Sequence, residues 1–282
     1  MKLYSIQIPK NQTNNIIYNC PHSGENFPDG FLNSIAIDEH TLLSSGDSFV
    51  NQLYAKASTY GSVLLANEYA RSFMDTNREA YELDPSMFSG EITAKLNSQS
   101  QKVRMGFGSI AKYAYTRNDI YNQKIPFKDA QARLDQYYFP IHEALQNTLF
   151  EKFEKFGYAL LIDCHSMPSY EFLGNQFATN KQPDIILGNL QGNSCNPVIT
   201  DFISQHFENH NLTVALNAPF AGGYNTSQYC APDKKRHSIQ IEIKKSLYMD
   251  EIKREPNQSF ERIKMVISSL CAALSKEIDN LI

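Results

Sequence analysis

The chain has 282 residues, of which 42% are hydrophobic and 20% charged, the proportions of an ordinary soluble globular protein. Its formal net charge of −4, from 26 basic and 30 acidic residues, argues against a nucleic-acid or membrane-surface partner, because either would favour a basic face. The cysteines at positions 20, 164, 195, 230 and 271 are odd in number and far apart, so we expect no disulfide framework and a cytoplasmic location.

The N-terminal part of the chain predicts two strands separated by a helix. Ile16–Tyr18 is a β-branched and aromatic run that predicts a strand ending in a loop of turn-forming residues. Apolar residues at helical spacing predict a helix over 47–57, with Gly61 suited to its end. Val63–Ala66 then predicts a buried strand.

The remainder begins with an irregular segment and then alternates helices with strands. Residues 84–124 are rich in Ser, Gly and Asn, and we interpret them as an excursion from the main sheet, with a β segment expected at 110–115. The later predicted elements are a helix over 128–156 that Pro140 should end or kink, strands at 158–163 and 184–188, a helix over 196–209, strands at 212–216 and 237–243, and a helix from 259 onward.

This alternation predicts the fold class. Strands that alternate with helices favour a single α/β domain over residues 1–282, with a mixed, mostly parallel sheet flanked by helices. No stretch approaches the roughly 20 apolar residues that span a bilayer, so we expect no membrane segment. In such sheets ligands bind beyond the carboxyl ends of the strands, and the polar motifs of this chain fall at those places.

Two histidines and a carboxylate near strand ends form a candidate metal site. His22 and Glu25 follow the first of these strands, and His165 follows the strand at 158–163. Two imidazoles and a carboxylate suit a catalytic zinc ion, which leaves a fourth position to water. Asp163 could orient one of the imidazoles. The alternative is that His165 is a loop residue hydrogen-bonded to backbone.

Glu242 is the candidate general base. In the strand at 237–243 the isoleucines share one face, whereas Gln240 and Glu242 share the other. A carboxylate inside an apolar strand is costly to bury without a partner. Near zinc it could take a proton from water and return it to a leaving amine. The alternative is an edge strand in which Glu242 pairs with Lys244 or Lys245.

Candidate anion contacts follow the strand at 63–66. Arg71 and Arg78 could grip a substrate carboxylate in bidentate fashion, together with Asn77. The alternative is that each arginine pairs with a neighbouring acid, Asp75 for Arg78 or Glu68 for Arg71. The loop that contains Gly223 and Tyr224 would allow close backbone approach and offer a hydroxyl donor to a ligand.

Five motifs occur in the order found in the N-formylglutamate amidohydrolase family, which the chain resembles from about residue 16 to 252. They are Pro21–Gly24, Asp75–Arg78, Asp163–Pro168, Asn217–Tyr224 and Gln240–Glu251. The resemblance implies a metal-dependent deformylase that cleaves N-formyl-L-glutamate to formate and L-glutamate late in histidine degradation. It also implies a zinc-carboxypeptidase-like (phosphorylase/hydrolase-like) fold.

The same resemblance assigns roles to the residues selected above. His22, Glu25 and His165 would bind one divalent ion, expected to be Zn²⁺, and Glu242 would be the base. Asn77 with Arg78 would hold a substrate carboxylate. Arg71 would be a second anion contact or an oxyanion stabiliser.

Three positions depart from the family pattern and leave the acyl amino acid open. The family commonly has a histidine at Phe139, an aromatic residue at Ile141 and an arginine near Lys112. Two alternatives follow. One is a related amidase or carboxypeptidase that acts on another N-acyl amino acid, and the other is a non-catalytic protein that binds anions without a metal.

Overall fold

The structure is a computed structural model that describes residues 2–115, 117–169 and 182–282. It contains two compact units. Unit 1 comprises residues 1–5, 21–48 and 66–145, and unit 2 comprises residues 6–20, 49–65 and 146–282. The single domain expected from the sequence stays a prediction. None of the described helices has both the length and the apolar content that a membrane crossing requires.

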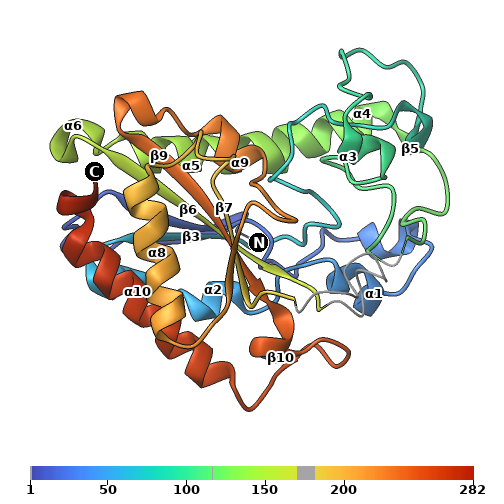
Figure 1. The fold of residues 1–282 in the computed structure, drawn as a ribbon. Helices are drawn as coiled ribbons and strands as arrows, with labels where there is room; N and C mark the ends of the chain where they lie inside the picture. Colours follow the sequence, from blue (N-terminus) through green and yellow to red (C-terminus); the bar gives the residue numbers. More distant parts are fainter. Residues whose placement is uncertain (1, 116, 170–181) are drawn as a thin grey trace. The chain divides into compact units, whose positions relative to one another are not determined.

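The largest sheet of the described residues has seven strands in the order β1-β3-β2-β6-β9-β7-β8 (Figure 1). Their bounds in that order are Tyr4–Gln7, Val63–Asn67, Ile16–Cys20, Ala159–Met167, Arg236–Lys244, Ile185–Gly188 and Val214–Leu216. β6 pairs in parallel with both β2 and β9, and β7 pairs in parallel with β8. β7 runs antiparallel to β9. The expected mixed, mostly parallel sheet is therefore confirmed.

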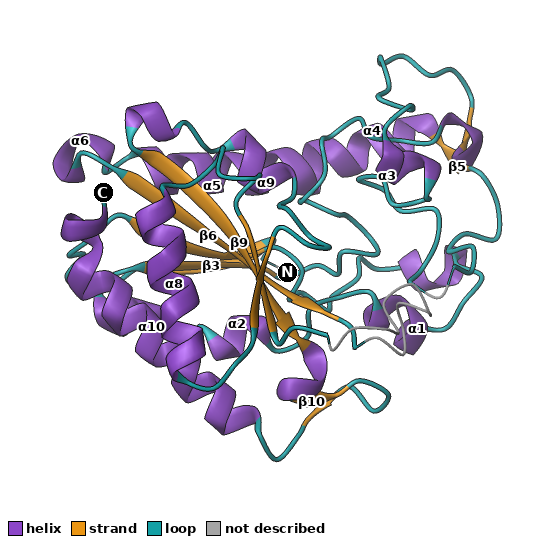
Figure 2. Cartoon of the chain, viewed as in Figure 1, coloured by secondary structure: helices purple, strands orange, loops and turns teal. Residues whose placement is uncertain are grey.

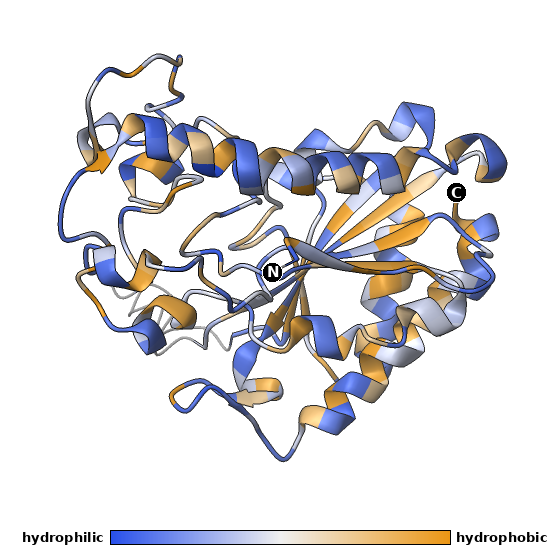
Figure 3. Cartoon of the chain, turned by 180° about the vertical axis from the view of Figure 1, so that it is seen from behind, coloured by the Kyte–Doolittle hydropathy of each residue, from blue (hydrophilic) through white to orange (hydrophobic). Residues whose placement is uncertain are grey.

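The inner strands supply the core of unit 2. Every residue of β2, β6 and β7 is buried, as strands covered on both faces require. Figure 3 shows the strands mainly in the colours of hydrophobic residues. β6 is longer than expected, because it continues through Asp163 and His165 to Met167. The end that carries His165 is therefore held by pairing with β9, and does not lie in a loop.

Helices of unit 2 cover this sheet. α8 (Pro197–Asn209) contacts β7 and β8, and α10 (Phe260–Leu281) packs against α8, as Figure 1 shows. α10 also contacts α2 (Val50–Leu53) and the 3₁₀ turn at Ala57–Tyr60. The short helices α6 (Phe153–Phe156) and α9 (Tyr224–Gln228) and the 3₁₀ turns at Pro232–Lys234 and Lys245–Leu247 also belong to this unit, and α9 contacts β6 and β9.

The single helix predicted over 47–57 is wrong. The chain forms only α2 and the 3₁₀ turn, because Phe49 has a left-handed backbone conformation with φ of 67°, which a continuous right-handed helix cannot include. Gly61 does end the segment, with φ of 81°.

Unit 1 consists largely of loops with short elements, as Figure 2 shows. These elements are 3₁₀ turns at Phe31–Ser34 and Pro85–Met87, α1 (Glu39–Ser44), α3 (Gln101–Arg104), α4 (Phe127–Arg133), and the paired β4 (Phe88–Ser89) and β5 (Ile125–Pro126). The β segment expected at 110–115 is wrong, since the only bridge described there joins Tyr113 to Asp119. A further hairpin-like pair, β10 (Met249–Asp250) with β11 (Glu255–Pro256), belongs to unit 2.

The helix predicted over 128–156 is interrupted before its proline. α4 is followed by a π-helical turn at Leu134–Tyr138 and then by α5 (Phe139–Phe150), with α6 separate. Pro140 has no N–H and its ring crowds the preceding turn, so the regular bonding pattern cannot continue through it. The wider π turn accommodates the proline, and the chain stays helical.

Candidate metal and active site

The polar end of β6 holds His165 in one orientation. His165 is 3% exposed, and its Nε2 lies 3.0 Å from Oδ2 of Asp163 on the same face of the strand. The other oxygen of Asp163 accepts hydrogen bonds from Asn19 Nδ2 at 3.0 Å and from Asn225 Nδ2 at 3.2 Å. The carboxylate is therefore fixed by two amides and in turn fixes the imidazole, as expected for an acceptor behind a metal ligand.

Glu242 lies beside His165 in strand register. β9 pairs with β6 so that Glu242 is opposite His165 and Gln240 is opposite Asp163. The Glu242 side chain is buried, and its Oε1 accepts a 2.7 Å hydrogen bond from Gln240 Nε2. β9 lies between β6 and β7, so it is not an edge strand, and Lys244 pairs with Asp184.

In unit 1 the loop that follows β2 places His22 between two carboxylates. His22 is 2% exposed, with Nε2 at 2.7 Å from Asp75 Oδ1 and Nδ1 at 3.4 Å from Asp47 Oδ2. The backbone N–H of Asp47 donates to the carbonyl of His22 at 2.8 Å. Gly24 allows this loop to approach another segment closely, because a Cβ there would lie 2.4 Å from the carbonyl carbon of Glu68.

Asp75 is the centre of a charged network in unit 1. Its Oδ2 lies 2.6 Å from Arg71 Nη2 and 3.9 Å from Arg78 Nη2. The alternative of an Asp75–Arg78 pair is therefore present, whereas the acid that faces Arg71 is Asp75 and not Glu68. Although burial raises the pKa of Asp75, the charges of Arg71, His22 and Arg78 outweigh it and hold that pKa well below its usual value. Because Asp75 is ionised, the nitrogen of His22 that faces it carries the proton.

The segment that contains Asn77 and Arg78 is firmly held. The backbone N–H of Asn77 donates to Asp75 Oδ1 at 2.9 Å, and Arg78 Nε donates to the carbonyl of Phe107 at 3.0 Å. From the helix with the π turn, Tyr138 donates its hydroxyl to the carbonyl of Arg78 at 2.6 Å. Arg78 is thus positioned by contacts with two other segments of unit 1.

Lys102 adds a cation that the sequence reasoning missed. Its carbonyl accepts a 2.8 Å hydrogen bond from the N–H of Phe107, the residue that binds Arg78. Partial desolvation, followed by the charges of Arg78 and Arg71, lowers the pKa of Lys102. The side chain is nevertheless exposed, and its ammonium group has no hydrogen bond or ion pair within the described residues. Only the fold could reveal it, because no motif surrounds it.

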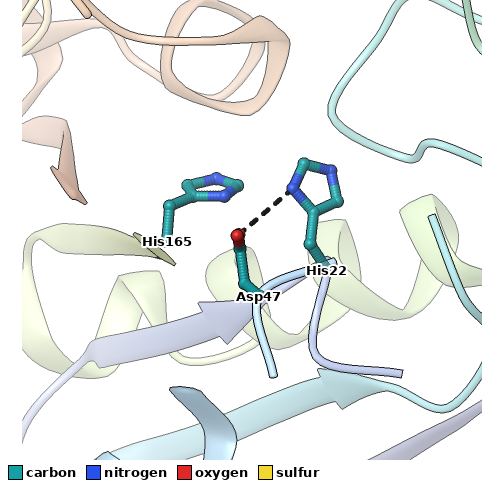
Figure 4. Close-up of side chains that lie close together, drawn as sticks. All are labelled: His22, Asp47 and His165. Atoms are coloured by element: carbon teal, nitrogen blue, oxygen red, sulfur yellow. Dashed lines mark ion pairs between the residues drawn. The ribbon is translucent and has the colours of Figure 1, made fainter. Parts of the chain in front are cut away.

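His22, Asp47 and His165 each offer one ligand atom, and the three atoms lie within 4.8 Å of one another (Figure 4). All three residues are buried, and two imidazoles with one carboxylate are a donor set that fits a divalent transition metal. In each histidine Nε2 faces an aspartate, so Nδ1 is the nitrogen suited to the ion. The two histidines selected from the sequence, His22 and His165, thus lie together, and Asp47 is a further candidate ligand that the sequence did not reveal.

Glu25, the carboxylate predicted from the sequence, lies outside this group. It is exposed, and its Oε1 accepts a 2.9 Å hydrogen bond from the hydroxyl of Ser48, the residue next to Asp47. Asp47 carries no recognisable signal in the sequence, because it stands at the start of an apolar stretch without a motif.

The loop with Gly223 and Tyr224 packs against the end of β7. A Cβ on Gly188 would lie 2.7 Å from the backbone of Ala221 and Gly222, so only glycine allows this approach. Gly223 and Tyr224 are partly exposed at the start of α9. Their predicted role in substrate binding stays a prediction.

Comparison with known proteins gives the family. The chain matches the sequence profile of N-formylglutamate amidohydrolase over residues 14–249. It is 29% identical over 239 residues to an N-formylglutamate deformylase of Pseudomonas putida, covering 84% of this chain and 82% of that relative. It is 26% identical over 241 residues to the deformylase of Pseudomonas aeruginosa, with the same coverage.

A solved structure agrees with these relatives. The crystal structure of N-formylglutamate amidohydrolase from Ralstonia eutropha JMP134 matches with a TM-score of 0.94 and 28% identity, covering 100% of both chains. The profile match spans most of this chain, and the fold match spans all of it. The chain therefore belongs to the N-formylglutamate amidohydrolase family.

Proposed function

We propose that this protein hydrolyses the formamide bond of N-formyl-L-glutamate to formate and L-glutamate, late in histidine degradation, with the help of a divalent metal ion. Membership of the family supports the reaction. The observation that carries the metal dependence is the buried group of His22, Asp47 and His165. Zinc is the ion we propose, because two imidazoles and one carboxylate are a usual ligand set of catalytic zinc.

The proposed ligands are His22, His165 and a carboxylate. Asp47 is the carboxylate that the geometry favours, and Glu25 stays the candidate suggested by its spacing from His22. Held by these residues, the ion would act as a Lewis acid toward the formyl oxygen and lower the pKa of a nearby water.

Glu242 is the proposed general base and acid. It takes one proton from the attacking water, whose oxygen forms the new bond to the formyl carbon. The bond from that carbon to nitrogen then breaks, and Glu242 returns the proton to the departing amine, so the products are formate and glutamate. The hydrogen bond from Gln240 fixes the direction of the carboxylate before substrate binds. Arg71 is proposed to stabilise the developing oxyanion or to act as a second anion contact.

The cations of unit 1 are proposed to hold the two substrate carboxylates. Arg78 with Asn77 binds one of them, and Arg71 and Lys102 attract the other. Arg71, Arg78 and Lys102 carry three positive charges against the two carboxylates of Asp75 and Glu82, which leaves an excess of one positive charge for an anionic ligand. The partly exposed backbone and hydroxyl of Gly223 and Tyr224 are proposed to complete the contacts.

Formate release from N-formyl-L-glutamate is the decisive assay, run with and without a chelator on protein of measured metal content. We expect about one metal ion per chain, formate production, and loss of activity with the chelator that zinc restores. A panel containing N-formyl-L-glutamine, N-formyl-L-methionine and N-acetyl-L-glutamate tests the substrate. Faster turnover of another N-acyl amino acid would change the substrate, and a metal-free protein that binds anions without turnover would overturn the proposal.

A further inference from the structure

The side-chain amide of Gln240 lies beside the proposed base, Glu242. Gln240 is 5% exposed, and its side chain lies on the same face of β9 as Glu242. The 2.7 Å contact joins Gln240 Nε2 to Glu242 Oε1. A carboxylate only accepts hydrogen bonds, so the chemistry requires the NH₂ group of the amide to face Glu242. The oxygen Oε1 of Gln240 must therefore be turned to the other side.

That oxygen is buried without a donor. Within the described residues, Gln240 Oε1 is inaccessible to solvent and accepts no hydrogen bond. Almost all buried polar atoms of folded proteins have a partner, so an orphaned acceptor beside a catalytic group requires an explanation. A ligand that brings its own donor into the site would supply the missing partner.

The residues paired with Gln240 on the two adjacent strands supply no side-chain donor for this oxygen. Gln240 is paired with Asp163 of β6 on one side and with Gly188 of β7 on the other. Both oxygens of Asp163 are used by amides and by His165. Gly188 has no side chain, and the backbone of Ala221 and Gly222 covers it. Gln240 thus lies between the fixed aspartate and the loop that leads to the proposed substrate contacts.

The chemistry of the substrate identifies the donor. N-formyl-L-glutamate at neutral pH has a formyl oxygen and two carboxylates, all of them acceptors, and its one donor is the N–H of the bond that breaks. We infer that Gln240 accepts a hydrogen bond through Oε1 from the formamide N–H, so that one side chain both orients Glu242 and holds the scissile amide. This inference rests on the proposed function and adds a residue that recognises the amide itself.

This contact would make the enzyme distinguish an amide from an ester. A site built around a hydrogen bond disfavours an analogue that lacks the donor, because a buried acceptor is then left unpaired. The matched analogue is (S)-2-formyloxyglutarate, in which an ester oxygen replaces the N–H while the formyl group and both carboxylates remain. Esters and amides differ in intrinsic reactivity, but this difference is the same for every variant. A change between variants in the amide-to-ester ratio of kcat/KM therefore reports the contact to the N–H.

The test compares wild type with Gln240→Met on both substrates. Loss of the contact to Glu242 should slow both reactions, and loss of the N–H contact should slow the formamide about tenfold more than the ester. Ser238→Ala is the control, because Ser238 is buried on the same face two residues away and also has an unpaired oxygen. It should leave the ratio unchanged.

The outcomes separate this inference from the proposed function. An unchanged amide-to-ester ratio in Gln240→Met, or an equal change in Ser238→Ala, would overturn the role of Gln240. Wild-type protein that releases formate from neither substrate would instead overturn the proposed function. If Gln240→Met does not fold, as judged by its thermal unfolding, Gln240→Asn keeps the amide but shortens it by one methylene, and the same shift in ratio is expected.

Discussion

The two histidines of the metal group are held in the same way by very different routes. His165 Nε2 faces Asp163, its neighbour two positions away on one face of β6. His22 Nε2 faces Asp75, which is 53 positions away along the chain. In both, an aspartate lies against Nε2, which leaves Nδ1 as the nitrogen suited to a metal ion.

The difference lies in what each aspartate is tied to. Asp163 is fixed by the neutral amides of Asn19 and Asn225, inside a strand paired on both sides. Asp75 is instead fixed by two arginines in a loop. The strand arrangement is rigid through the backbone, whereas the loop arrangement depends on charge. The loop side therefore couples the metal ligand to the cations that we propose to hold the substrate.

Removal of the base should give the largest effect. Glu242→Gln keeps the size of the side chain but cannot accept the proton, so we expect kcat to fall by about 10²–10⁴-fold with metal content unchanged. Steady-state formate release with metal analysis checks this, and exposed Glu261→Gln is the matched control. Near-wild-type turnover in Glu242→Gln would show that the proton goes elsewhere.

A pair of matched variants tests whether Asp47 or Glu25 is the carboxylate that binds the metal ion. Asp47→Asn should lower metal content well below one ion per chain, and Glu25→Gln should leave it near one, because the carboxylate that groups with both histidines among the described residues is that of Asp47. His165→Ala serves as the positive control for metal loss. Normal metal binding in Asp47→Asn together with loss in Glu25→Gln would restore the assignment made from the sequence.

The comparison of the two aspartates is tested directly by Asp163→Asn and Asp75→Asn. Each should weaken metal binding by about 10–100-fold, because each positions one ligand from behind. Only Asp75→Asn should also change KM for N-formyl-L-glutamate, since its loss releases Arg71 and Arg78. Equal effects of both variants on KM would contradict the proposed coupling between the loop carboxylate and substrate binding.

Replacement of Lys102 should have a smaller effect, and it should alter substrate binding alone. Lys102→Met should raise KM for N-formyl-L-glutamate by about three- to tenfold with kcat unchanged, because an exposed cation contributes modestly. The increase should be absent with N-formyl-L-glutamine, which lacks the side-chain carboxylate, if Lys102 contacts that group. Lys102→Arg, which keeps the charge, is the control.

The smallest effect is expected for His206, a histidine outside the proposed metal group. His206 Nε2 lies 3.2 Å from the carbonyl of Val266 and 3.1 Å from Ser269 Oγ, and burial followed by the charge of His210 lowers its pKa below 6.5. As the pH falls through 6.5, the unfolded chain takes up the proton first, so stability that is present above 6.5 is lost toward pH 5.

Urea unfolding at pH 7.5 and pH 5.5 measures that loss. His206→Gln should reduce the difference in unfolding free energy between the two pH values, and His40→Gln, on exposed α1, should not. An identical pH dependence in His206→Gln and wild type would contradict the assignment.

The residues that could be found from the sequence are those carried by regular strands. Alternation along the strand at 237–243 placed Gln240 and Glu242 on one face, and the apolar run before Asp163 located His165 at the polar end of a central strand. A period of two fixes which side chains share a face, so local pattern alone was sufficient for these groups.

Asp47 and the pairing of Asp75 with His22 belong to loops, where no period links position to direction, and Lys102 lies in the four-residue helix α3, which is too short to show a period. The pairing register of β9 with β6 likewise places Glu242 opposite His165. The strand order shows that β9 is not the edge strand that the sequence allowed. Residues 53 positions apart meet only when backbone pairing and charge balance are satisfied together. The sequence by itself therefore determined the family, the sheet and which polar side chains share a face of a strand, and the tertiary structure decided which carboxylates face each histidine.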